Sequence, residues 1–496
     1  MRTMLSVLLA LAAAIGLSAQ SSVQQASAPL TLSQAVQRAL DHSPERKLAQ
    51  ADASAARVAA RSARLPLLPT LGFDEQITRG NDPVYVFGSL LRQQRFTTAD
   101  FALNSLNRPL PLNNFASRFS GNWLAFDSFQ TELGMRSADH QARAAVAIAS
   151  RADQQLAWRV AASYIGVLLA RQQARLAADQ VKTAQALVDA SAARVQAGTA
   201  VSADALSAAT ALAARREEAI AADGNLATAW AQLEQAIGAP IPHAERNLAP
   251  LSAATHPLPP LADAVAQALR SRLDRQALAE QLASARTGVT AARAGFGPTV
   301  GAFGSWEQDR DAFTGNSGNN WLAGVQVHLD LFPAARRQQL AAAKIALTRT
   351  QAASQSADNQ IRMEVTRAWF AHQTASQQME VARAAQAQAD ESLRILGNRY
   401  DAGLATITDL LRAQDAQRQA QTAWSQAVGA NASSWVDFQF ATGTLNPLTR
   451  ALDLTAPETA MPDTAAPDLT TPAPRGAQST ASRFSAPQTT LSQEAQ

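Results

Sequence analysis

The sequence predicts an internally duplicated α+β membrane protein, in which very long helices are combined with four short β-strands. Three observations indicate this class. The same order of segments occurs twice, long stretches lack proline, and short stretches alternate between apolar and polar residues. A length of 496 residues would allow roughly two to four ordinary domains. The repetition indicates instead one elongated unit built from two copies.

Composition excludes several classes of function. The 43 Lys and Arg residues barely exceed the 40 Asp and Glu residues, and the net charge of +3 is too small to indicate a nucleic-acid partner. The chain contains no cysteine, which excludes disulfides, thiolate metal sites, cysteine nucleophiles and a lipid-modified N-terminal cysteine. Charged residues make up only 17% of the chain, which suits long, weakly charged helices.

The N-terminal segment predicts secretion. Arg2 precedes an apolar run from Met4 to Leu17, and Ser18-Ala19 follows as a small-residue cleavage region. We therefore expect residues 1–19 to be a signal peptide. A membrane anchor is the weaker alternative, because the run is shorter than the ~20 residues that a spanning helix needs. No second long apolar run follows, so we expect the mature chain to be soluble or to enter a membrane as a β-barrel.

The duplication is visible as matched residue pairs at nearly constant offsets. The offset is 229 residues at the start, falls to 198, and is 205 further on, which predicts 31 extra residues in the first copy between about 80 and 114. The matched segments are Ala35-Val36 with Ala264-Val265, Pro69-Thr70 with Pro298-Thr299, Asn122-Trp123-Leu124 with Asn320-Trp321-Leu322, and Ala197-Gly198 with Ala402-Gly403.

These matches predict a domain organisation. The first copy covers residues 30–240, with the 80–114 insertion expected on the extracellular side, and the second copy covers residues 261–445. Residues 241–260 are rich in proline and form the expected linker between the copies. Residues 451–496 are rich in Thr, Ala, Ser and Pro, and we expect a disordered tail there.

Each copy is expected to begin with helix, over Ser33–Arg64 and Leu261–Ala294, with Ser33 as an N-cap. Prolines such as Pro66 and Pro298 end these helices. Very long helices are expected later in each copy. Residues 334–396 lack both proline and glycine, and these 63 residues could form one helix of roughly 95 Å.

An apolar stripe runs along both predicted long helices with i, i+4, i+8 spacing, which is typical of a face that packs against a partner. A helix this long needs partners along its length, so we interpret the stripe as core packing. The stripe residues are Leu156, Val160 and Tyr164 in the first copy and Ile361, Val365 and Trp369 in the second.

Two alternating stretches stand between the helices of each copy. Leu71, Phe73 and Ile77 alternate with polar residues, and residues 321–331 do the same. Alternation over about ten residues is typical of a barrel strand with a lipid face and a wet lumen. His328 and Asp330 lie on the lumen phase, so we prefer that reading to a metal site. Because about eight strands make the smallest closed barrel, four strands must be pooled from several copies of the chain.

The sequence resembles the TolC-type outer-membrane efflux proteins from Leu30 to about Gly443. The residues that carry the resemblance are the opening Leu30-Thr31-Leu32-Ser33-Gln34-Ala35-Val36, the barrel entry Leu65-Pro66-Leu67-Leu68-Pro69-Thr70-Leu71, the barrel exit Leu329-Asp330-Leu331-Phe332, the paired turns Arg194-Val195-Gln196-Ala197-Gly198 and Arg399-Tyr400-Asp401-Ala402-Gly403, and Thr406-Ile407-Thr408-Asp409-Leu410-Leu411.

The resemblance implies a homotrimer whose protomers each give four strands to one transmembrane β-barrel in the outer membrane. The long helices would form an α-barrel tunnel across the periplasm, whose far end meets a periplasmic adaptor (membrane fusion) protein and an inner-membrane pump. The expected function is the exit duct of a tripartite efflux or type I secretion system. We expect no enzyme activity, cofactor or metal. The alternative is a secreted periplasmic coiled-coil scaffold without a pore.

The candidate functional site lies at the two helix turns, where Gly198 and Gly403 permit tight turns between long helices. By resemblance these turns, with Ala405 and Thr406, form the periplasmic tip that docks the adaptor. Tyr400 matches a tyrosine that holds the aperture closed. Asp204 matches the aspartate with which that tyrosine pairs across protomers. The family arginine of this network is replaced by Ala405.

A second part of the expected aperture is acidic in the family. Asp409 matches the first of two pore-facing aspartates, and Arg412 stands at the position of the second. The alternative reading for Asp204 and Asp409 is that they stabilise helix N-termini just after the turns. The two roles are compatible.

Overall fold

The computed structural model describes residues 29–253, 256–315 and 317–447. All of them lie in one compact unit, Met1–Ala456. The predicted signal peptide, residues 1–19, and the predicted tail, residues 451–496, lie outside the described residues.

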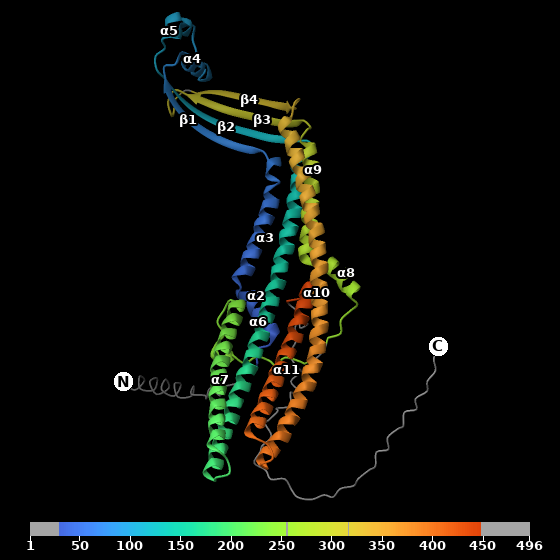
Figure 1. The fold of residues 1–496 in the computed structure, drawn as a ribbon. Helices are drawn as coiled ribbons and strands as arrows, with labels where there is room; N and C mark the ends of the chain where they lie inside the picture. The colour runs from blue at the N-terminus through green and yellow to red at the C-terminus, as the bar shows by residue number, and fades with distance from the viewer. Residues whose placement is uncertain (1–28, 254–255, 316, 448–496) are drawn as a thin grey trace, which may run out of the picture. The chain divides into compact units, whose positions relative to one another are not determined.

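The same order of elements occurs twice: two short helices, two strands and two long helices (Figure 1). In chain order the elements are α2 (Leu32–His42), α3 (Pro44–Ser62), η1 (Leu65–Leu67), β1 (Thr70–Gly80), α4 (Pro83–Arg92), η2 (Thr98–Phe101), α5 (Leu103–Asn107), β2 (Leu112–Phe126), α6 (Gln130–Gln196), α7 (Ser202–Ile237), η3 (His243–Glu245), α8 (Leu261–Ser271), α9 (Leu273–Ala294), β3 (Thr299–Arg310), β4 (Ser317–His328), α10 (Ala334–Asp401) and α11 (Ile407–Thr442).

The first helix does not begin where the sequence predicted. Thr31, not Ser33, is the N-cap of α2. The Thr31 side chain accepts a hydrogen bond from the Gln34 backbone N–H, and the Gln34 side chain accepts one from the Thr31 N–H. This reciprocal capping box satisfies two backbone donors that have no partner inside the helix, which explains why the helix begins after Thr31.

The single helices expected over 33–64 and 261–294 are each interrupted once. Ser43 separates α2 from α3, and Arg272 separates α8 from α9. The buried Arg272 guanidinium lies 2.5 Å from a Glu364 carboxylate oxygen of α10 and donates to the Ala441 carbonyl oxygen of α11. This interruption therefore fixes the short helices of the second copy to its two long helices.

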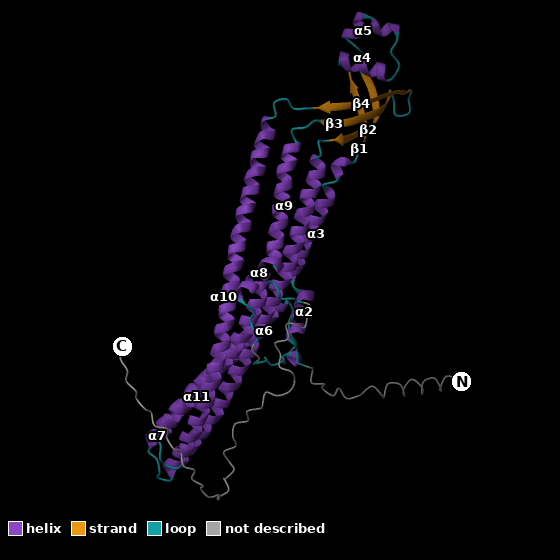
Figure 2. Cartoon of the chain, turned by 90° about the vertical axis from the view of Figure 1, so that its right-hand side faces the viewer, coloured by secondary structure: helices purple, strands orange, loops and turns teal. Residues whose placement is uncertain are grey.

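The long helices are as continuous as the sequence predicted. α6 has 67 residues and α10 has 68, so α10 also passes through Gly397 without a break. Figure 2 shows the helices running side by side, with the strands at one end. Among the described residues, no helix combines the length and the apolar character needed to cross a membrane.

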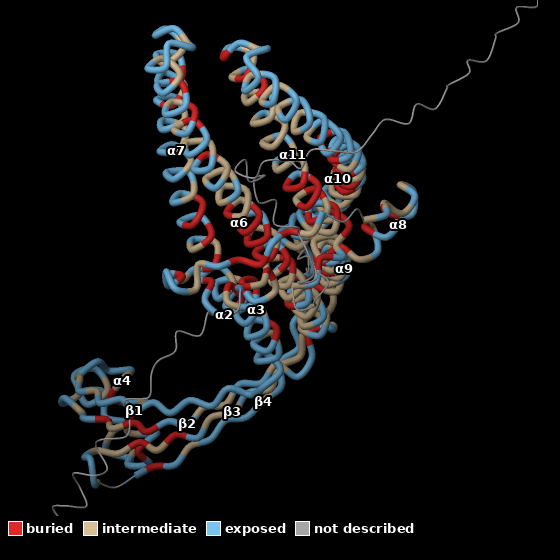
Figure 3. The backbone as a smooth tube through the Cα atoms, turned by 90° about the horizontal axis from the view of Figure 1, so that it is seen from below, coloured by how far each residue is buried: buried red, intermediate tan, exposed pale blue. Residues whose placement is uncertain are grey.

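Five of the six stripe residues are buried in the core, as predicted, and Trp369 is partly buried and packs against it. Val160, Tyr164 and Val365 are fully buried, and Leu156 and Ile361 nearly so. The Tyr164 hydroxyl donates to two backbone carbonyl oxygens, which satisfies its polar group inside an apolar cluster. Buried residues gather midway along the helices (Figure 3).

The four strands form one antiparallel sheet in the order β1-β2-β3-β4. In register, Phe73 pairs with Phe119, Phe119 with Trp306, and Trp306 with Trp321, so one row of aromatic side chains crosses the whole sheet. The ring centroids of Phe73 and Phe119 are 4.8 Å apart. The large apolar side chains of this face, including Leu71 (86% exposed) and Trp321 (80% exposed), are open in the single chain.

The register corrects one match made from the sequence. The two Asn-Trp-Leu segments are not at equivalent heights, because Trp321 pairs with Trp306 whereas Trp123 pairs with Ala302. Ala302 in turn pairs with Val325, four residues after Trp321. The two tripeptides therefore share letters but not a position in the sheet.

Candidate functional site

Both predicted turns are built in the same way. Gly198 follows α6 with φ +70°, and Gly403 follows α10 with φ +73°. In the first turn, the Gly198 N–H donates to the Val195 carbonyl oxygen and the Thr199 N–H to the Arg194 carbonyl oxygen. The second turn makes the equivalent pair of bonds. Each is a Schellman motif, which reverses the chain after a helix and needs a left-handed residue.

Backbone conformation, and not crowding, requires glycine at these turns. A Cβ at Gly198 or Gly403 would meet no atom within 4 Å, so space is available there. A residue with a side chain would be strained there by its φ angle alone. The turns therefore fix the ends of two helical hairpins, α6–α7 and α10–α11, without needing close packing around the glycines.

A small apolar cluster joins the two hairpins just above the turns. Leu187 of α6, Ala208 of α7, and Ile407 and Leu410 of α11 are buried in it. Tyr400, in the last turn of α10, packs against this cluster. The tip is therefore a packed unit that includes one of the predicted aperture residues.

A cation that the sequence analysis did not identify lies on Tyr400. The Arg194 guanidinium carbon is 4.3 Å from the centroid of the Tyr400 ring, and an Arg194 Nη lies 3.1 Å from an Asp401 carboxylate oxygen. Arg194 lies in the last turn of α6, whereas Tyr400 and Asp401 lie in the last turn of α10, so this contact joins the two hairpins of one chain. The only sequence signal was that Arg194 belongs to the first matched turn segment.

The other half of the predicted latch stands on α7. Asp204 lies in the first turn of that helix, where the helix dipole favours a carboxylate. Its pairing with Tyr400 across protomers stays a prediction. The position of the missing family arginine, Ala405, is part of the turn between α10 and α11.

Asp409 takes part in the N-terminal cap of its helix, as the third helical residue of a capping box. Thr406 is the N-cap of α11, and the Asp409 Oδ2 accepts hydrogen bonds from the Thr406 N–H (3.2 Å) and hydroxyl (2.7 Å). These hydrogen bonds lower the pKa of Asp409, and the charges of Arg412 and Arg399 lower it further. Arg412 and Asp409 are not among the ion pairs of the described residues, so Arg412 acts on Asp409 at longer range.

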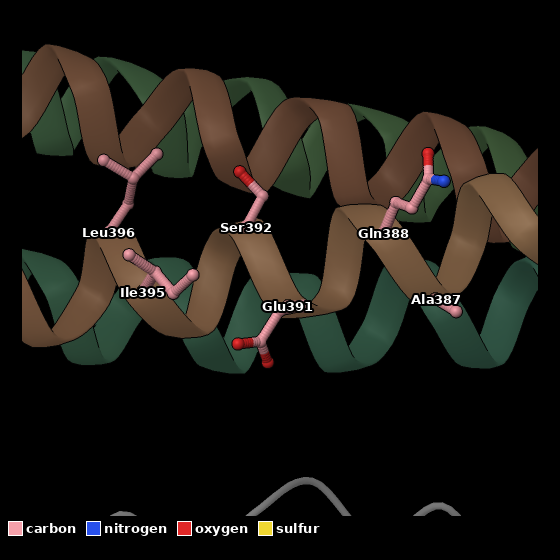
Figure 4. Close-up of a pocket in the computed structure, with 6 residues that line it drawn as sticks. All are labelled: Ala387, Gln388, Glu391, Ser392, Ile395 and Leu396. Atoms are coloured by element: carbon pink, nitrogen blue, oxygen red, sulfur yellow. The ribbon is translucent and has the colours of Figure 1, made fainter. Parts of the chain in front are cut away.

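A groove that the sequence analysis did not predict runs along α10 above the turn (Figure 4). It has a volume of about 490 Å³. Two rows of side chains at i, i+4 spacing line it, and its exposed apolar member is Ile395. The lining residues are Ala387, Glu391 and Ile395 in one row and Gln388, Ser392 and Leu396 in the other.

Known proteins share this architecture. CmeC, an outer membrane channel of Campylobacter jejuni, is 17% identical with a TM-score of 0.71, covering 85% of this chain and 87% of that one. VceC, an outer membrane protein of Vibrio cholerae, is 19% identical with a TM-score of 0.69, covering 83% and 96%. The open state of MtrE, an outer membrane channel of Neisseria gonorrhoeae, is 20% identical with a TM-score of 0.70, covering 85% and 90%.

No curated protein sequence matches this chain. The family model described as outer membrane efflux protein matches residues 35–239 and 264–444. Its two blocks contain the strands and the long helices of both copies. The chain thus belongs to the outer membrane efflux protein family, and it is an outer-membrane efflux channel that extends into the periplasm.

Proposed function

We propose that three copies of this chain form the exit duct of a tripartite efflux or type I secretion system. The duct passively conducts substrates from the periplasm or a pump to the exterior. The observation that carries this proposal is the four-stranded sheet, whose apolar face is open and whose outer strands β1 and β4 each have one strand neighbour in the described chain. Because a strand edge leaves backbone donors and acceptors unpaired, neighbouring copies would complete one closed barrel in the outer-membrane lipid.

A periplasmic scaffold without a pore is not favoured. In water, a contiguous face of large apolar side chains would be a liability. A lipid environment removes that cost, and the row of Phe73, Phe119, Trp306 and Trp321 suits the aromatic belt of a membrane interface.

The helix turns are the proposed periplasmic aperture. Tyr400 would hold the closed state through Arg194 within its own chain and through Asp204 of a neighbouring copy. Asp409 and Arg412 would set the charge around the pore axis. Support comes from the placement of these side chains: Arg412 lies in the second turn of α11, and the others lie in the last or first turns of the four long helices.

We also propose that the adaptor docks at this end. The exposed turns Gly198 and Gly403, with Ala405 and Thr406, would present the tip. The nearby groove on α10 is lined at i, i+4 spacing, which is the spacing at which a partner helix is recognised. The proposed occupant is a helix of an adaptor that links the duct to a pump.

The domain boundaries follow the repeat. We propose a first copy over residues 30–240, a linker over 241–260 and a second copy over 261–445. The α7 helix ends before Gly238 and α8 begins at Leu261, which supports a linker between them.

The experiment that tests the function combines mass and conductance. Detergent-extracted protein should have the mass of a trimer by light scattering and should give discrete conductance steps in a planar bilayer. A monomer without conductance would contradict the proposal. Recovery in the outer-membrane fraction as a heat-stable oligomer would further separate a channel from a periplasmic scaffold.

A further inference from the structure

The connection between β1 and β2 packs against the ends of the strands. It contains α4, η2 and α5 (Figure 1), and it begins beside the strands: the Tyr85 hydroxyl donates to the Thr78 carbonyl oxygen at 2.9 Å and also contacts the Leu112 carbonyl oxygen. Phe87, Phe96 and Phe101 pack edge to face inside the connection. The segment is therefore an ordered element with its own small apolar contacts.

One buried glutamine anchors this segment. Gln93 is 2% exposed, and its Nε2 donates to the Asn113 carbonyl oxygen and to Asn114 Oδ1, both at 2.8 Å. It also donates to the Arg310 carbonyl oxygen at 3.3 Å. Because these acceptors belong to β2 and β3, the side chain ties the end of α4 to both repeats.

The contacts continue onto β4. Asn320 of that strand donates to the Arg92 carbonyl oxygen at 3.0 Å. The approach at Gly318 is so close that a Cβ there would overlap the same carbonyl oxygen. Arg92 also lies 3.4 Å from Glu307 of β3. The segment thus crosses the sheet from β1 to β4, and glycine at 318 is required by the close approach.

All these contacts lie on one face. Arg118 is paired with Asp74 and with Glu307, and Glu307 with Asn320, so these side chains share the polar phase of the strands. The aromatic row from Phe73 to Trp321 belongs to the opposite phase. In a membrane barrel the apolar phase meets lipid and the polar phase lines the lumen.

We propose that residues 83–107 form a second constriction, at the outer mouth of the channel, that selects exported substrates by size. This inference rests on the proposed barrel. The segment stands at the strand ends farthest from the long helices (Figure 2), and its contacts with Asn114, Glu307 and Asn320 lie on the polar phase, which faces the lumen of the proposed barrel. With threefold symmetry, three such segments would lean into one opening. The outer constriction is separate from the periplasmic aperture, so bulky substrates must pass two narrow points.

The test uses the absence of cysteine from the chain. Ser305→Cys places one thiol on the lumen face, two residues before Glu307 in β3 and on the same side of the strand. Intact cells that carry this variant are exposed to maleimides with attached polyethylene glycol of increasing size. The comparison chain has residues 82–111 replaced by one glycine, so that Asn81-Gly closes the hairpin at the Gly80–Leu112 pair. Ser105→Cys, on the exposed surface of α5, reports reagent access from outside.

With the native segment, large reagents should label Ser305→Cys slowly. In the chain with the shortened loop, their labelling rate should rise at least about tenfold, because the segment no longer has to open locally before a reagent can pass. Equal rates with and without the segment would overturn the constriction. A different outcome would contradict the barrel itself. In that outcome no reagent labels Ser305→Cys in the shortened chain, although Ser105→Cys in the native loop is labelled, and the lumen that the proposed barrel requires is then absent.

A single substitution covers the case in which the shortened loop does not fold. Gln93→Ala removes the buried anchor but keeps the length, and should accelerate labelling by large reagents by a factor on the order of ten, because an unmatched buried hydrogen-bond group shifts local opening. Gln308→Ala is the matched control, since it removes an amide on the opposite phase whose side-chain partner among the described residues is Ser317. Equal acceleration by both variants, or none by Gln93→Ala, would contradict the proposal.

Discussion

At the scale of single residues, a cation contacts Tyr400 at the helix turns although the position expected to hold an arginine is Ala405. The family arginine is absent at Ala405, yet Arg194 places a guanidinium on Tyr400 and beside Asp401. An exposed cation–π contact contributes about 0.5–1 kcal/mol, and an exposed ion pair about 0.2–1 kcal/mol. If the turns form the proposed aperture, this contact would favour its closed state only modestly.

Arg194→Ala is expected to raise resting conductance in a planar bilayer severalfold. The reason is that a loss of about 1.4 kcal/mol in the stability of the closed state would change the ratio of open to closed channels by a factor of ten. Tyr400→Phe should have a smaller effect, since it keeps the ring under the guanidinium. Lys182→Ala is the control, because the Lys182–Asp179 pair lies within one helix and joins no hairpins. Unchanged conductance in Arg194→Ala would show that this contact is no latch.

Charge at the aperture is a second residue-scale property. Three Asp409 carboxylates around one axis would attract cations, and three Arg412 side chains would offset them. Arg412→Asp is therefore expected to strengthen cation preference and block by multivalent cations, and Asp409→Asn to weaken the remaining preference. The measurement is the reversal potential in a salt gradient. A potential that Arg412→Asp leaves unchanged would remove Arg412 from the pore.

At the scale of elements, a buried histidine joins the long helices of the second copy to the chain before α8. His372 of α10 is fully buried; its Nε2 donates to the His256 carbonyl oxygen at 3.3 Å, and its Nδ1 lies 2.9 Å from Ser434 Oγ of α11. Burial lowers the pKa of His372 below its ordinary 6.5, and the charge of His256 lowers it further. The folded chain thus holds this ring neutral.

This histidine predicts a pH dependence of stability. The unfolded chain binds the proton at higher pH than the folded chain, so the contribution is complete above about pH 6.5 and is lost as pH falls towards the lowered pKa. One pH unit between the two pKa values corresponds to about 1.4 kcal/mol. His372→Gln should flatten the decline of the thermal midpoint between about pH 7 and pH 5. If the thermal midpoint of His372→Gln fell as steeply with decreasing pH as that of the native chain, other groups would cause the pH dependence of stability.

The elements that repeat could be predicted from sequence, because periodicity and proline spacing are local signals. The buried stripe from Leu156 to Tyr164 and the continuous α10 are examples. Contacts between distant segments could not be predicted: nothing near Arg194 indicates Tyr400, and nothing near Gln93 indicates Arg310. The break at Ser43 has a local signal, because Pro44 follows it and begins α3, and the prediction of one helix over 33–64 overlooked it. The break at Arg272 has no such signal, because Arg272 is held by partners on α10 and α11 rather than followed by a helix-breaking residue.

At the scale of the whole molecule, the central claim is that neighbouring chains complete the sheet that one chain leaves open. Within a chain, β1 and β4 are separated by β2 and β3, so they are brought together only if a neighbour's β4 meets β1. The helices of one chain otherwise bury their own apolar cores, and one of these cores is shared between the two repeats. The assembly therefore depends on the strand edges and on the long helices beside them.

The most direct test links those edges in intact cells. Asp74→Cys on β1 and Leu322→Cys on β4 are combined in one chain and treated with a flexible bis-maleimide. Each single variant can join at most two chains. For the double variant we predict products of one, two and three chains and none larger, because the third link closes the ring. A product limited to single chains, or a ladder that continues beyond three, would contradict the shared barrel.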